Sequence, residues 1–403
     1  MIKKKSSSKD KPHFLFFAYA AVGSGISGSD RIFIELAKRW NKTNDVHIYV
    51  TEEGLAMTKK QELSDKHIHV TKMNQWYAFS FLGHYIARII LGIYKGLSLT
   101  LDNPEQTIIY SASEFWMDSL PGLFLKLRYP TVCWVGTWYQ TAPNPLAGFA
   151  EGDRKETYRF KALLYYLAQL PIKPLLGRFT DYIIVNNEDE RKRFSRHNKK
   201  NKIIVLIGAV NLDEIDYYKK KFARIAKKYD AIFQGRFHPQ KGVVEMIEIW
   251  KKVTQKMSNA QLIMLGDGPL MPVVKQKIVE FGLEKNIMLT GFMFDGEEKY
   301  KLFSQSKVVV HPAFYDSGGM AAAEIMAFGL PCVGFNLKAY ESYYPVGMVK
   351  AEIGDIDQFA ENIIKLLKNK KLSNDIGNKA EEIIHKKYSW DKRAKEVYNA
   401  IAS

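Results

Sequence analysis

The sequence contains little cysteine. Cys133 and Cys332 are the only 2 cysteines among 403 residues, and they stand far apart. Two isolated cysteines provide neither a disulfide framework nor a cluster of metal ligands. A convincing signal peptide is also missing, because the basic, polar start leads into one short apolar run without a small-residue cleavage site. We therefore expect a protein of the reducing cytoplasm.

The sequence also lacks an uninterrupted apolar run that could cross a membrane. Such a helix needs about 20 mostly apolar residues with few charges. The longest nearly apolar segment, residues 78–101, contains His84, Arg88 and Lys95, which fall on roughly one face of a helix. Two interpretations stay open: a helix packed inside an α/β domain, or a helix that rests on a membrane surface.

Positively charged residues outnumber negatively charged ones. The formal net charge is +16 and the pI is about 9.4, which favours nucleic acid, phosphorylated small molecules or an acidic membrane face as partners. The lysine clusters at 3–5, 219–221 and 227–228 lack the interleaved aromatic residues of a nucleic-acid platform. We expect no nucleic-acid partner, and a lysine-rich surface that serves only solubility is the simpler alternative.

Short apolar runs alternate with helical patterns along the chain, which predicts βαβ units on parallel sheets. The charged segment 212–230 has no clear strand and suits a linker. We predict an α/β protein with two Rossmann-like, doubly wound domains, residues 1–212 and 213–388. A C-terminal helix within 389–403 is expected to pack back on the first domain. Ligands of such sheets bind beyond the carboxyl ends of the strands, so facing domains would form a cleft between them.

A glycine-rich loop follows the first apolar run. Gly23, Gly25 and Gly28 spell G-x-G-x-x-G between an expected strand and an expected helix, the context of a dinucleotide fingerprint. Glu52 and Glu53 stand about where a ribose-binding acid would be. A nicotinamide or flavin oxidoreductase is therefore one hypothesis. A loop of this kind at a helix start also suits any phosphate or sugar hydroxyl, so Gly25, Ser27 and Gly28 can equally face another donor or acceptor.

The second half carries two acidic residues in one motif. Asp316 follows an apolar strand, and Glu324 stands eight positions later in the helix opened by glycines. Backbone N–H groups of Gly318, Gly319 and Met320 at that helix start are expected to be free to bind a phosphate.

Basic residues and further glycine turns accompany these acids. Arg236 and Lys241 are five apart in GRFHPQKG, and this pair suits a diphosphate that gains negative charge as it leaves. Turns at LGDGP and TGF add Gly266 and Phe292 at two more strand ends.

The ordered motifs G-R-F…K-G, L-G-D-G-P, G-F and H-P…D-x7-E…A-x-G-L-P resemble the nucleotide-sugar domain of the retaining glycosyltransferases with the GT-B fold. These enzymes are the group 1 glycosyltransferases, and the resemblance is to the type called glycosyltransferase family 4. The resemblance is strong over residues 230–336. It is thinner elsewhere, where it rests on the glycine-rich loop, residues 178–194 and 205–215, and the closing YSW at 388–390.

The resemblance implies a role for each motif residue. Asp316 would contact the donor sugar and Glu324 the ribose, while Arg236 and Lys241 would hold the diphosphate. Gly318, Gly319, Met320, Gly266 and Phe292 would complete the donor site. Asp316 replaces the commoner Glu and is one methylene shorter.

A second departure concerns the first domain. Relatives often have a His after the strand that corresponds to TVCWVG, and Thr137, Trp138 and Tyr139 stand there instead. Trp138 and Tyr139 could stack on an acceptor, or could form an aromatic wedge between loop and core.

The resemblance also implies the chemistry: a hexose moves from a nucleotide sugar to an acceptor hydroxyl with retention at the anomeric carbon. The leaving diphosphate would assist deprotonation of the acceptor. A UDP- or GDP-sugar is the expected donor, with no cofactor and no essential metal. The basic first half and the segment 78–101 favour a lipid-linked or anionic lipid acceptor at the inner membrane face, in glycan or glycolipid synthesis. A soluble or polymeric acceptor remains the alternative.

Overall fold

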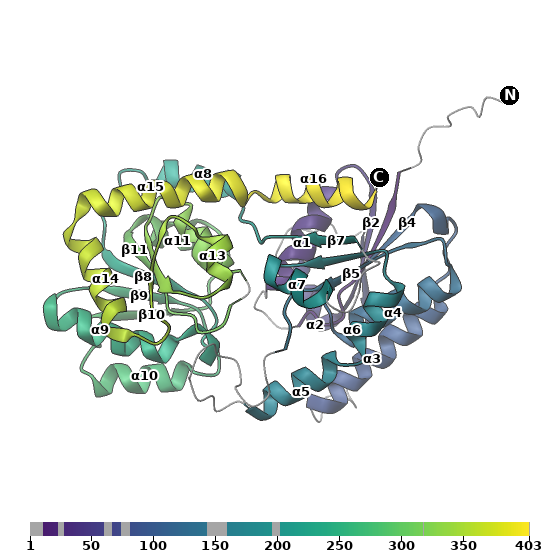
Figure 1. Ribbon diagram of the computed structural model, residues 1–403, viewed down its shortest axis with the longest axis horizontal. Helices are drawn as coiled ribbons and strands as arrows, with labels where there is room; N and C mark the ends of the chain where they lie inside the picture. Colours follow the sequence, from purple (N-terminus) through teal and green to yellow (C-terminus); the bar gives the residue numbers. More distant parts are fainter. Residues whose placement is uncertain are drawn as a thin grey trace. The chain divides into compact units, whose positions relative to one another are not determined.

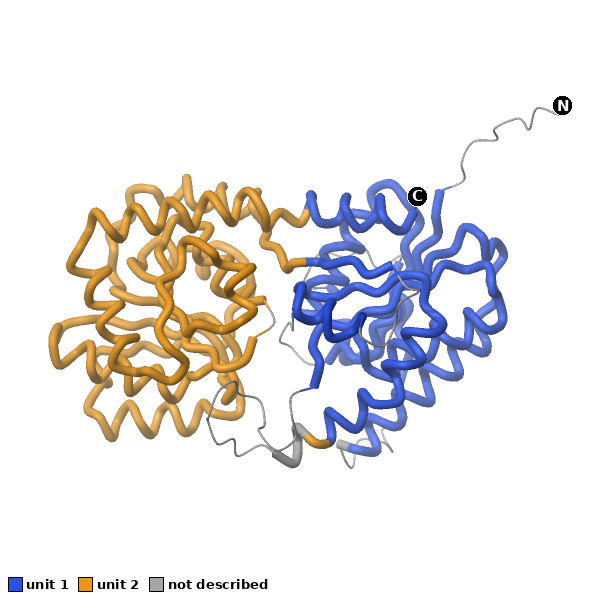
Figure 2. The backbone as a smooth tube through the Cα atoms, viewed as in Figure 1, with its two compact units in different colours: residues 1–142, 164–206, 391–403 blue, residues 143–163, 207–390 orange. Residues whose placement is uncertain are grey.

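The computed structural model describes residues 11–22, 28–59, 67–73, 81–142, 159–195, 202–316 and 318–402. The chain divides into two compact units (Figure 2). Unit 1 contains residues 1–142, 164–206 and 391–403, and unit 2 contains residues 143–163 and 207–390. Each unit is built on one parallel sheet, so the prediction of two doubly wound α/β domains is confirmed.

Unit 1 has a seven-stranded sheet in the order β3-β2-β1-β4-β5-β6-β7. Figure 1 labels β2, β4, β5 and β7 of this sheet. Its strands are apolar because helices cover both faces of a parallel sheet; all five residues of β4, for example, are buried. The strands are β1 (His13–Phe17), β2 (Asp45–Thr51), β3 (Ile68–Thr71), β4 (Thr107–Ser111), β5 (Cys133–Trp138), β6 (Tyr182–Val185) and β7 (Lys202–Val205).

The helices of unit 1 lie between successive strands, as βαβ units require, except for α16, which follows the strands of unit 2 in the chain. They are α1 (Gly28–Trp40), α2 (Glu52–Lys59), α3 (Phe81–Ser98), α4 (Trp116–Arg128), α5 (Arg159–Gln169), α6 (Ile172–Phe179), α7 (Glu188–Ser195) and α16 (Trp390–Ile401). Helices α3 and α4 pack closely, since a Cβ atom at Gly92 would lie 2.6 Å from the Met117 carbonyl oxygen. A Cβ at Gly96 would lie 2.9 Å from Cα of Pro121.

The C-terminal helix α16 contacts α1 within unit 1. Arg39 Nε donates to Asp391 Oδ1 at 2.8 Å, and Trp40 Nε1 donates to the Ala394 carbonyl at 3.0 Å. Ala394 and Trp40 are buried, so the contact combines apolar burial with paired polar groups.

Unit 2 has a six-stranded sheet in the order β10-β9-β8-β11-β12-β13. Alternate residues of its strands face two separate apolar clusters: Phe233 of β8 belongs to one and Ile232 to the other. The strands are β8 (Tyr229–Gln234), β9 (Leu262–Leu265), β10 (Ile287–Gly291), β11 (Ser306–His311), β12 (Cys332–Phe335) and β13 (Met348–Ala351).

The helices of unit 2 alternate with these strands. They are α8 (Leu212–Lys221), α9 (Val243–Lys256), α10 (Met271–Glu280), α11 (Glu297–Ser304), α12 (Met320–Met326), α13 (Ala339–Tyr343), α14 (Ile356–Lys368) and α15 (Lys370–Lys387), with the short 3-10 helix η4 (Pro239–Lys241) after β8.

The linker prediction for residues 212–230 was wrong. Most of that segment is helix α8, which belongs to unit 2 because Ile215 is fully buried in its core and Leu212 and Tyr218 pack against the same cluster. Acidic residues in its first turn and lysines in its last turn suit the helix dipole. The many charged residues of this segment made the short amphipathic pattern of α8 hard to recognise in the sequence.

Strands β8 and β11 lie at the centre of the second sheet. From β8 the chain moves outward through β9 to β10, then returns to β11 beside β8 and moves outward again through β12 to β13. Beyond the carboxyl ends of such a strand pair the connecting loops diverge, and ligands of open α/β sheets bind at that point.

Candidate functional site

The loops after β8 and β11 are joined by backbone contacts. Phe314 N donates to the Gln240 carbonyl at 2.9 Å. Gly242 has φ +63, and a Cβ atom there would lie 1.9 Å from the Pro312 carbonyl oxygen. Only glycine fits such an approach. This contact brings the residue before it, Lys241, against the loop that carries Asp316.

Lys241 and Asp316 form the centre of the site. Lys241 Nζ donates to Asp316 Oδ2 at 2.5 Å. His311 Nε2 lies 3.0 Å from the same oxygen, and the Tyr340 hydroxyl donates to it at 3.2 Å. The Asp316 side chain is only 8% exposed. A buried carboxylate is therefore surrounded by one cation and two further polar groups.

The other oxygen of Asp316 caps the start of α12. Gly318 N and Gly319 N donate to Oδ1 at 3.2 and 3.1 Å. The prediction that these two N–H groups are free for a phosphate was therefore wrong in this structure, because the short Asp316 side chain folds back onto its own loop. Gly319 has φ +58 and precedes Met320, the first residue of α12.

Asp316 is ionised and has little spare bonding capacity. Burial alone would raise its pKa, but Lys241 and His311 outweigh burial and hold the pKa well below the usual value. A carboxylate offers about four lone-pair sites, and five groups already contact this one. A sugar hydroxyl could bind Asp316 only by displacing one of them.

Glu324 lies in a second polar cluster of unit 2. Lys299 Nζ donates to its Oε2 at 2.7 Å, and Gln234 Nε2 donates to the same oxygen at 2.9 Å. The Tyr300 hydroxyl donates to Oε1 at 3.3 Å. Lys299 is 4% exposed and also pairs with Asp295 at 2.8 Å. This cluster joins the end of β8 to helices α11 and α12.

Arg236 is exposed on the loop after β8. It follows Gln234 and Gly235, and its carbonyl accepts from His238 N at 2.8 Å. Arg236 and Lys241 thus share one loop, but only Lys241 is held against Asp316. An exposed guanidinium on the same loop as a partly buried lysine is available to an anionic ligand.

The structure gives Gly266 a packing role. Its φ is +140, and a Cβ atom would lie 1.8 Å from the Gly235 carbonyl oxygen. Its N–H donates to the Gly291 carbonyl at 2.9 Å. Gly266 therefore ties the ends of β8, β9 and β10 together. Phe292 is exposed after β10 and packs edge-on against Phe294, with 4.7 Å between ring centroids.

Sequence reasoning missed several members of these clusters. Lys299 occupies a lysine-rich amphipathic helix, where a solvated lysine is the usual expectation. Tyr340 comes from α13, and its sequence gave no signal that it would reach Asp316. His311 offered a signal, since it ends a strongly apolar strand where a polar side chain is unusual.

The glycine-rich loop of unit 1 lies mostly outside the described residues, including Gly25 and Ser27. Gly28 is exposed as the first residue of α1. Glu53, predicted near a ribose, is an ion-pair partner of Arg88 and His84 of α3. It therefore holds α2 and α3 together in this structure.

Trp138 and Tyr139 do not form an acceptor surface. Both are buried: Trp138 lies in the core beside Phe194, and its Nε1 donates to Thr141 Oγ1 at 2.9 Å. The Tyr139 hydroxyl lies 2.8 Å from that of Tyr110. The stacking prediction was wrong, because these aromatics fill the space between the loop and the core.

Buried acids organise the carboxyl edge of the unit 1 sheet. Asp118 Oδ1 accepts from Ala20 N at 2.9 Å and its Oδ2 from Ser113 Oγ at 2.5 Å. Burial raises the pKa of Asp118 to about 8. Burial likewise raises the pKa of Glu114, which accepts from the Tyr165 hydroxyl at 2.8 Å. No pattern in the sequence predicted that Asp118 and Glu114 would be buried.

Helix α3 has its polar face inward. Arg88 is buried against Glu53, and Lys95 Nζ lies 4.8 Å from the Tyr49 ring. The outward face is apolar, and the exposed fractions of its five large side chains lie between 46% and 67%: Leu82, Ile86, Ile90, Tyr94 and Leu97. Among the described residues, no helix is long and apolar enough to span a membrane.

Comparison with known proteins finds its family match within unit 2. The family model described as glycosyl transferases group 1 matches residues 214–383. An uncharacterized glycosyltransferase of Methanocaldococcus jannaschii is 29% identical over 175 residues, covering 42% of this chain and 43% of that protein. N-acetyl-α-D-glucosaminyl L-malate synthase of Bacillus anthracis is 24% identical over 190 residues, covering 45% and 49%. The matches span less than half the length of these curated relatives.

A solved structure extends the similarity to the whole fold. Anabaena HepE in complex with UDP and glucose has a TM-score of 0.71 at 15% identity, covering 97% of this chain and 100% of that chain. At this identity the likeness concerns the fold. The predicted GT-B fold class, with two parallel-sheet α/β domains, is confirmed.

Proposed function

We propose that this chain is a glycosyltransferase that moves a sugar from a nucleoside diphosphate sugar to an acceptor hydroxyl. The observation that carries the proposal is the Lys241–Asp316 pair at the carboxyl ends of β8 and β11, where open α/β sheets bind ligands. The family match to residues 214–383 covers both residues. The resemblance described above connects this pair to a nucleotide-sugar site.

In this proposal Lys241 and Arg236 bind the diphosphate. Asp316 holds Lys241 in place. Arg236 is exposed, and its planar guanidinium can donate two parallel hydrogen bonds to phosphate oxygens. Two cations near the leaving group stabilise the negative charge that develops on it. Because these two cations can neutralise the leaving group, we expect no essential divalent metal. Turnover should survive excess chelator, and loss of turnover would contradict this expectation.

Glu324 is assigned to the ribose hydroxyls. Lys299 and Gln234 both donate to Oε2, whereas the contact of Oε1 with the Tyr300 hydroxyl is longer, at 3.3 Å. A ribose hydroxyl can therefore donate to Oε1 at little cost. Lys299 holds the carboxylate in place without contacting the nucleotide.

Asp316 is assigned as a positioning residue. Its five existing contacts leave no lone pair for a sugar hydroxyl, and its principal partner is the phosphate-binding Lys241. The shorter side chain supports this role, because a longer one would project further from the loop. The sugar itself would then be held by other groups or by backbone.

We expect transfer with retention of a hexose. Orientation and charge stabilisation supply the catalysis, and the leaving diphosphate accepts the acceptor proton on the same face. The C–O bond to the diphosphate breaks as the bond to the acceptor oxygen forms. Proton NMR of the first product should show the anomeric configuration of the donor; the opposite anomer would contradict retention.

A donor screen tests the function directly. UDP, GDP, ADP and their sugars are compared by thermal shift on the full chain, followed by assay of sugar release with the donor that stabilises most. We expect one nucleoside diphosphate to raise the melting temperature clearly more than the others, with UDP or GDP the leading candidates. Equal, negligible shifts for all of them would contradict the proposal.

For the acceptor we propose a lipid-linked or anionic lipid molecule at a membrane surface. The outward apolar stripe of α3 suits insertion among acyl chains, and the net charge of +16 suits an anionic headgroup layer. A soluble acceptor is the alternative, as the name of the malate synthase relative implies for that protein.

Flotation with anionic liposomes separates these acceptor classes. The wild type should float with the vesicles, and Ile86→Ser/Ile90→Ser should remain in the soluble fraction. The matched control is Val273→Ser/Val279→Ser, which removes two exposed apolar side chains from α10 of unit 2 and should float normally. Wild-type protein that stays soluble would contradict the membrane proposal while leaving the donor screen unaffected.

A further inference from the structure

Four of the nine histidines gather at one corner of unit 1, whereas the proposed donor site belongs to unit 2. His13 is the first residue of β1, Asp45 is the first residue of β2, and His67 directly precedes β3. These three strands are neighbours in the sheet and run parallel, so the cluster lies at the amino-terminal edge. The proposed donor site uses the carboxyl edge of the other sheet.

The strand register places the polar side chains on one face. His13 pairs with Asp45, and Ile48 pairs with Ile68, so that His47 and His67 are adjacent. Residues two apart on a strand share a face, which brings His47 and Asp45 together. The arrangement thus follows from the pairing of β1, β2 and β3 and does not depend on one flexible side chain.

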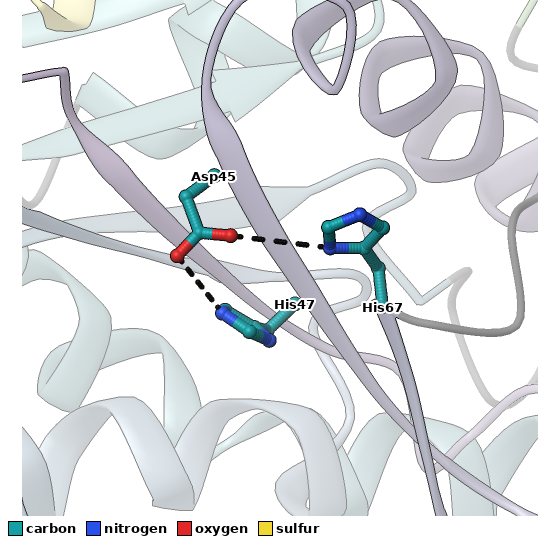
Figure 3. Close-up of side chains that lie close together, drawn as sticks. All are labelled: Asp45, His47 and His67. Atoms are coloured by element: carbon teal, nitrogen blue, oxygen red, sulfur yellow. Dashed lines mark hydrogen bonds and ion pairs between the residues drawn. The ribbon is translucent and has the colours of Figure 1, made fainter.

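Three side chains converge on a common point (Figure 3). His47 Nε2 lies 3.1 Å from Asp45 Oδ2, and His67 Nδ1 lies 3.9 Å from Asp45 Oδ1. One ligand atom from each residue lies within 4.8 Å of the others. Ligands around a tetrahedral Zn²⁺ are separated by ~3.4 Å, given metal–ligand bonds of ~2.1 Å. A small inward movement would complete the geometry.

His67 Nδ1 supplies an independent indication of a missing ligand. This atom is buried and makes no hydrogen bond. A buried imidazole nitrogen without a hydrogen bond is costly, and a bound cation would satisfy it. The nearest oxygen of the Asp45 carboxylate, Oδ1, lies 3.9 Å from it, a distance too long for a hydrogen bond.

Neighbouring histidines are also arranged as they would be around a metal site. His47 Nδ1 lies 2.9 Å from His69 Nε2, so His47 can donate from Nδ1 while Nε2 faces the common point. A metal-binding histidine normally donates its other N–H to such an acceptor. His13 Nδ1 lies 2.9 Å from Asp45 Oδ2 and orients the carboxylate.

We propose that Asp45, His47 and His67 form a binding site for a first-row divalent metal ion, of which Zn²⁺ fits best. Imidazole nitrogen and carboxylate oxygen are ordinary zinc ligands, and three protein ligands leave a fourth position for water. His69 and His13 position the ligands. The ion would fasten the edge strand β3 to β2 and is independent of the proposed transfer reaction, so it conflicts with no metal-free mechanism at the donor site.

The test uses untagged, EDTA-treated full-length protein titrated with Co²⁺ and Zn²⁺. Co²⁺ should give the visible absorption of a nitrogen- and oxygen-ligated site at one equivalent, and Zn²⁺ should displace it. His67→Ala should weaken Zn²⁺ binding at least about tenfold. This variant removes a ligand atom that makes no hydrogen bond, so folding should be little affected.

The matched control is His385→Ala in unit 2. His385 Nε2 lies 2.9 Å from Asp216 Oδ1, and the exposed fractions of this pair, 32% and 41%, resemble those of His67 and Asp45. It should bind Zn²⁺ as the wild type does. Less than one equivalent bound by the wild type, or unchanged affinity in His67→Ala, would overturn the proposal. Neither result bears on nucleotide binding, which the donor screen measures separately.

Discussion

At the scale of single residues, Asp316 and Asp118 show how burial and partners set opposite protonation states. Both side chains are nearly enclosed by protein. Asp316 has Lys241 beside it, and its pKa is held well below the usual value despite burial. Asp118 has only neutral donors, and burial raises its pKa to about 8. The neighbouring cation decides which side chain is charged at neutral pH.

The positioning role of Asp316 predicts non-additive effects on donor binding. Asp316→Asn should weaken nucleoside diphosphate binding about tenfold, because Lys241 loses its anchor. In a Lys241→Met background the same change should add almost nothing. Binding measured for the wild type, both single variants and the double variant gives the coupling. Additive losses would contradict the role, since they would mean that Asp316 contacts the donor independently.

The raised pKa of Asp118 predicts a pH-dependent stability. Between about pH 4 and pH 8 the unfolded chain has released a proton that the folded protein retains. The free energy of unfolding should therefore fall as pH rises through this window, by at most ~1.4 kcal/mol per pH unit. Asp118→Asn does not titrate, and its amide can accept from Ala20 N while donating to Ser113. Its stability relative to the wild type should increase from pH 5 to pH 8.

Urea unfolding at the two pH values measures this difference. The matched control is Asp102→Asn, an exposed aspartate of unit 1, for which the difference from wild type should not change with pH. A stability difference for Asp118→Asn that is the same at both pH values would show that Asp118 is already ionised when folded.

At the scale of elements, α3 shows what periodicity can and cannot predict. The sequence indicated a helix with its charges on one face, which is correct. It could not indicate which face is inward, because that depends on Glu53 of α2, which contacts Arg88 and His84. The same limit applies to α8, where Ile215 and its neighbours reveal the buried side only once α8 is packed against the unit 2 core.

The close packing of α3 on α4 predicts a large cost for a single methyl group. Gly92→Ala places a Cβ atom 2.6 Å from the Met117 carbonyl oxygen, so the helices must separate. We expect a loss of ~1–3 kcal/mol in the free energy of unfolding, although alanine favours helix by about 1 kcal/mol. Urea unfolding measures the change.

Ile90→Ala on the exposed face of α3 is the control for this substitution. It also introduces an alanine into α3 but creates no contact with α4, so stability should change by less than ~0.5 kcal/mol. If Gly92→Ala were as stable as the wild type or more stable, the helices would not be in the close contact described here.

At the scale of the whole molecule, topology explains why distant motifs could be assigned to one site. Lys241 and Asp316 are 75 positions apart, yet the parallel order of β8 and β11 places their loops together. Alternating apolar runs sufficed to predict parallel sheets, but they did not indicate that β8 and β11 are neighbours. Lys299 and Tyr340 escaped prediction because their contacts depend on where helices α11 and α13 pack, and residue type alone gives no indication of that.

We propose that the loops after β8 and β11 bind a nucleoside diphosphate sugar. Titration calorimetry of the best nucleotide from the donor screen tests it most directly, comparing the wild type with Lys241→Met and Lys307→Met. Lys307 pairs with Asp230 at 2.7 Å near the opposite ends of the same two strands, so it is a matched control. We expect at least about tenfold weaker binding, or ~1.4 kcal/mol, for Lys241→Met alone. Equal affinity in all three proteins would contradict the claim.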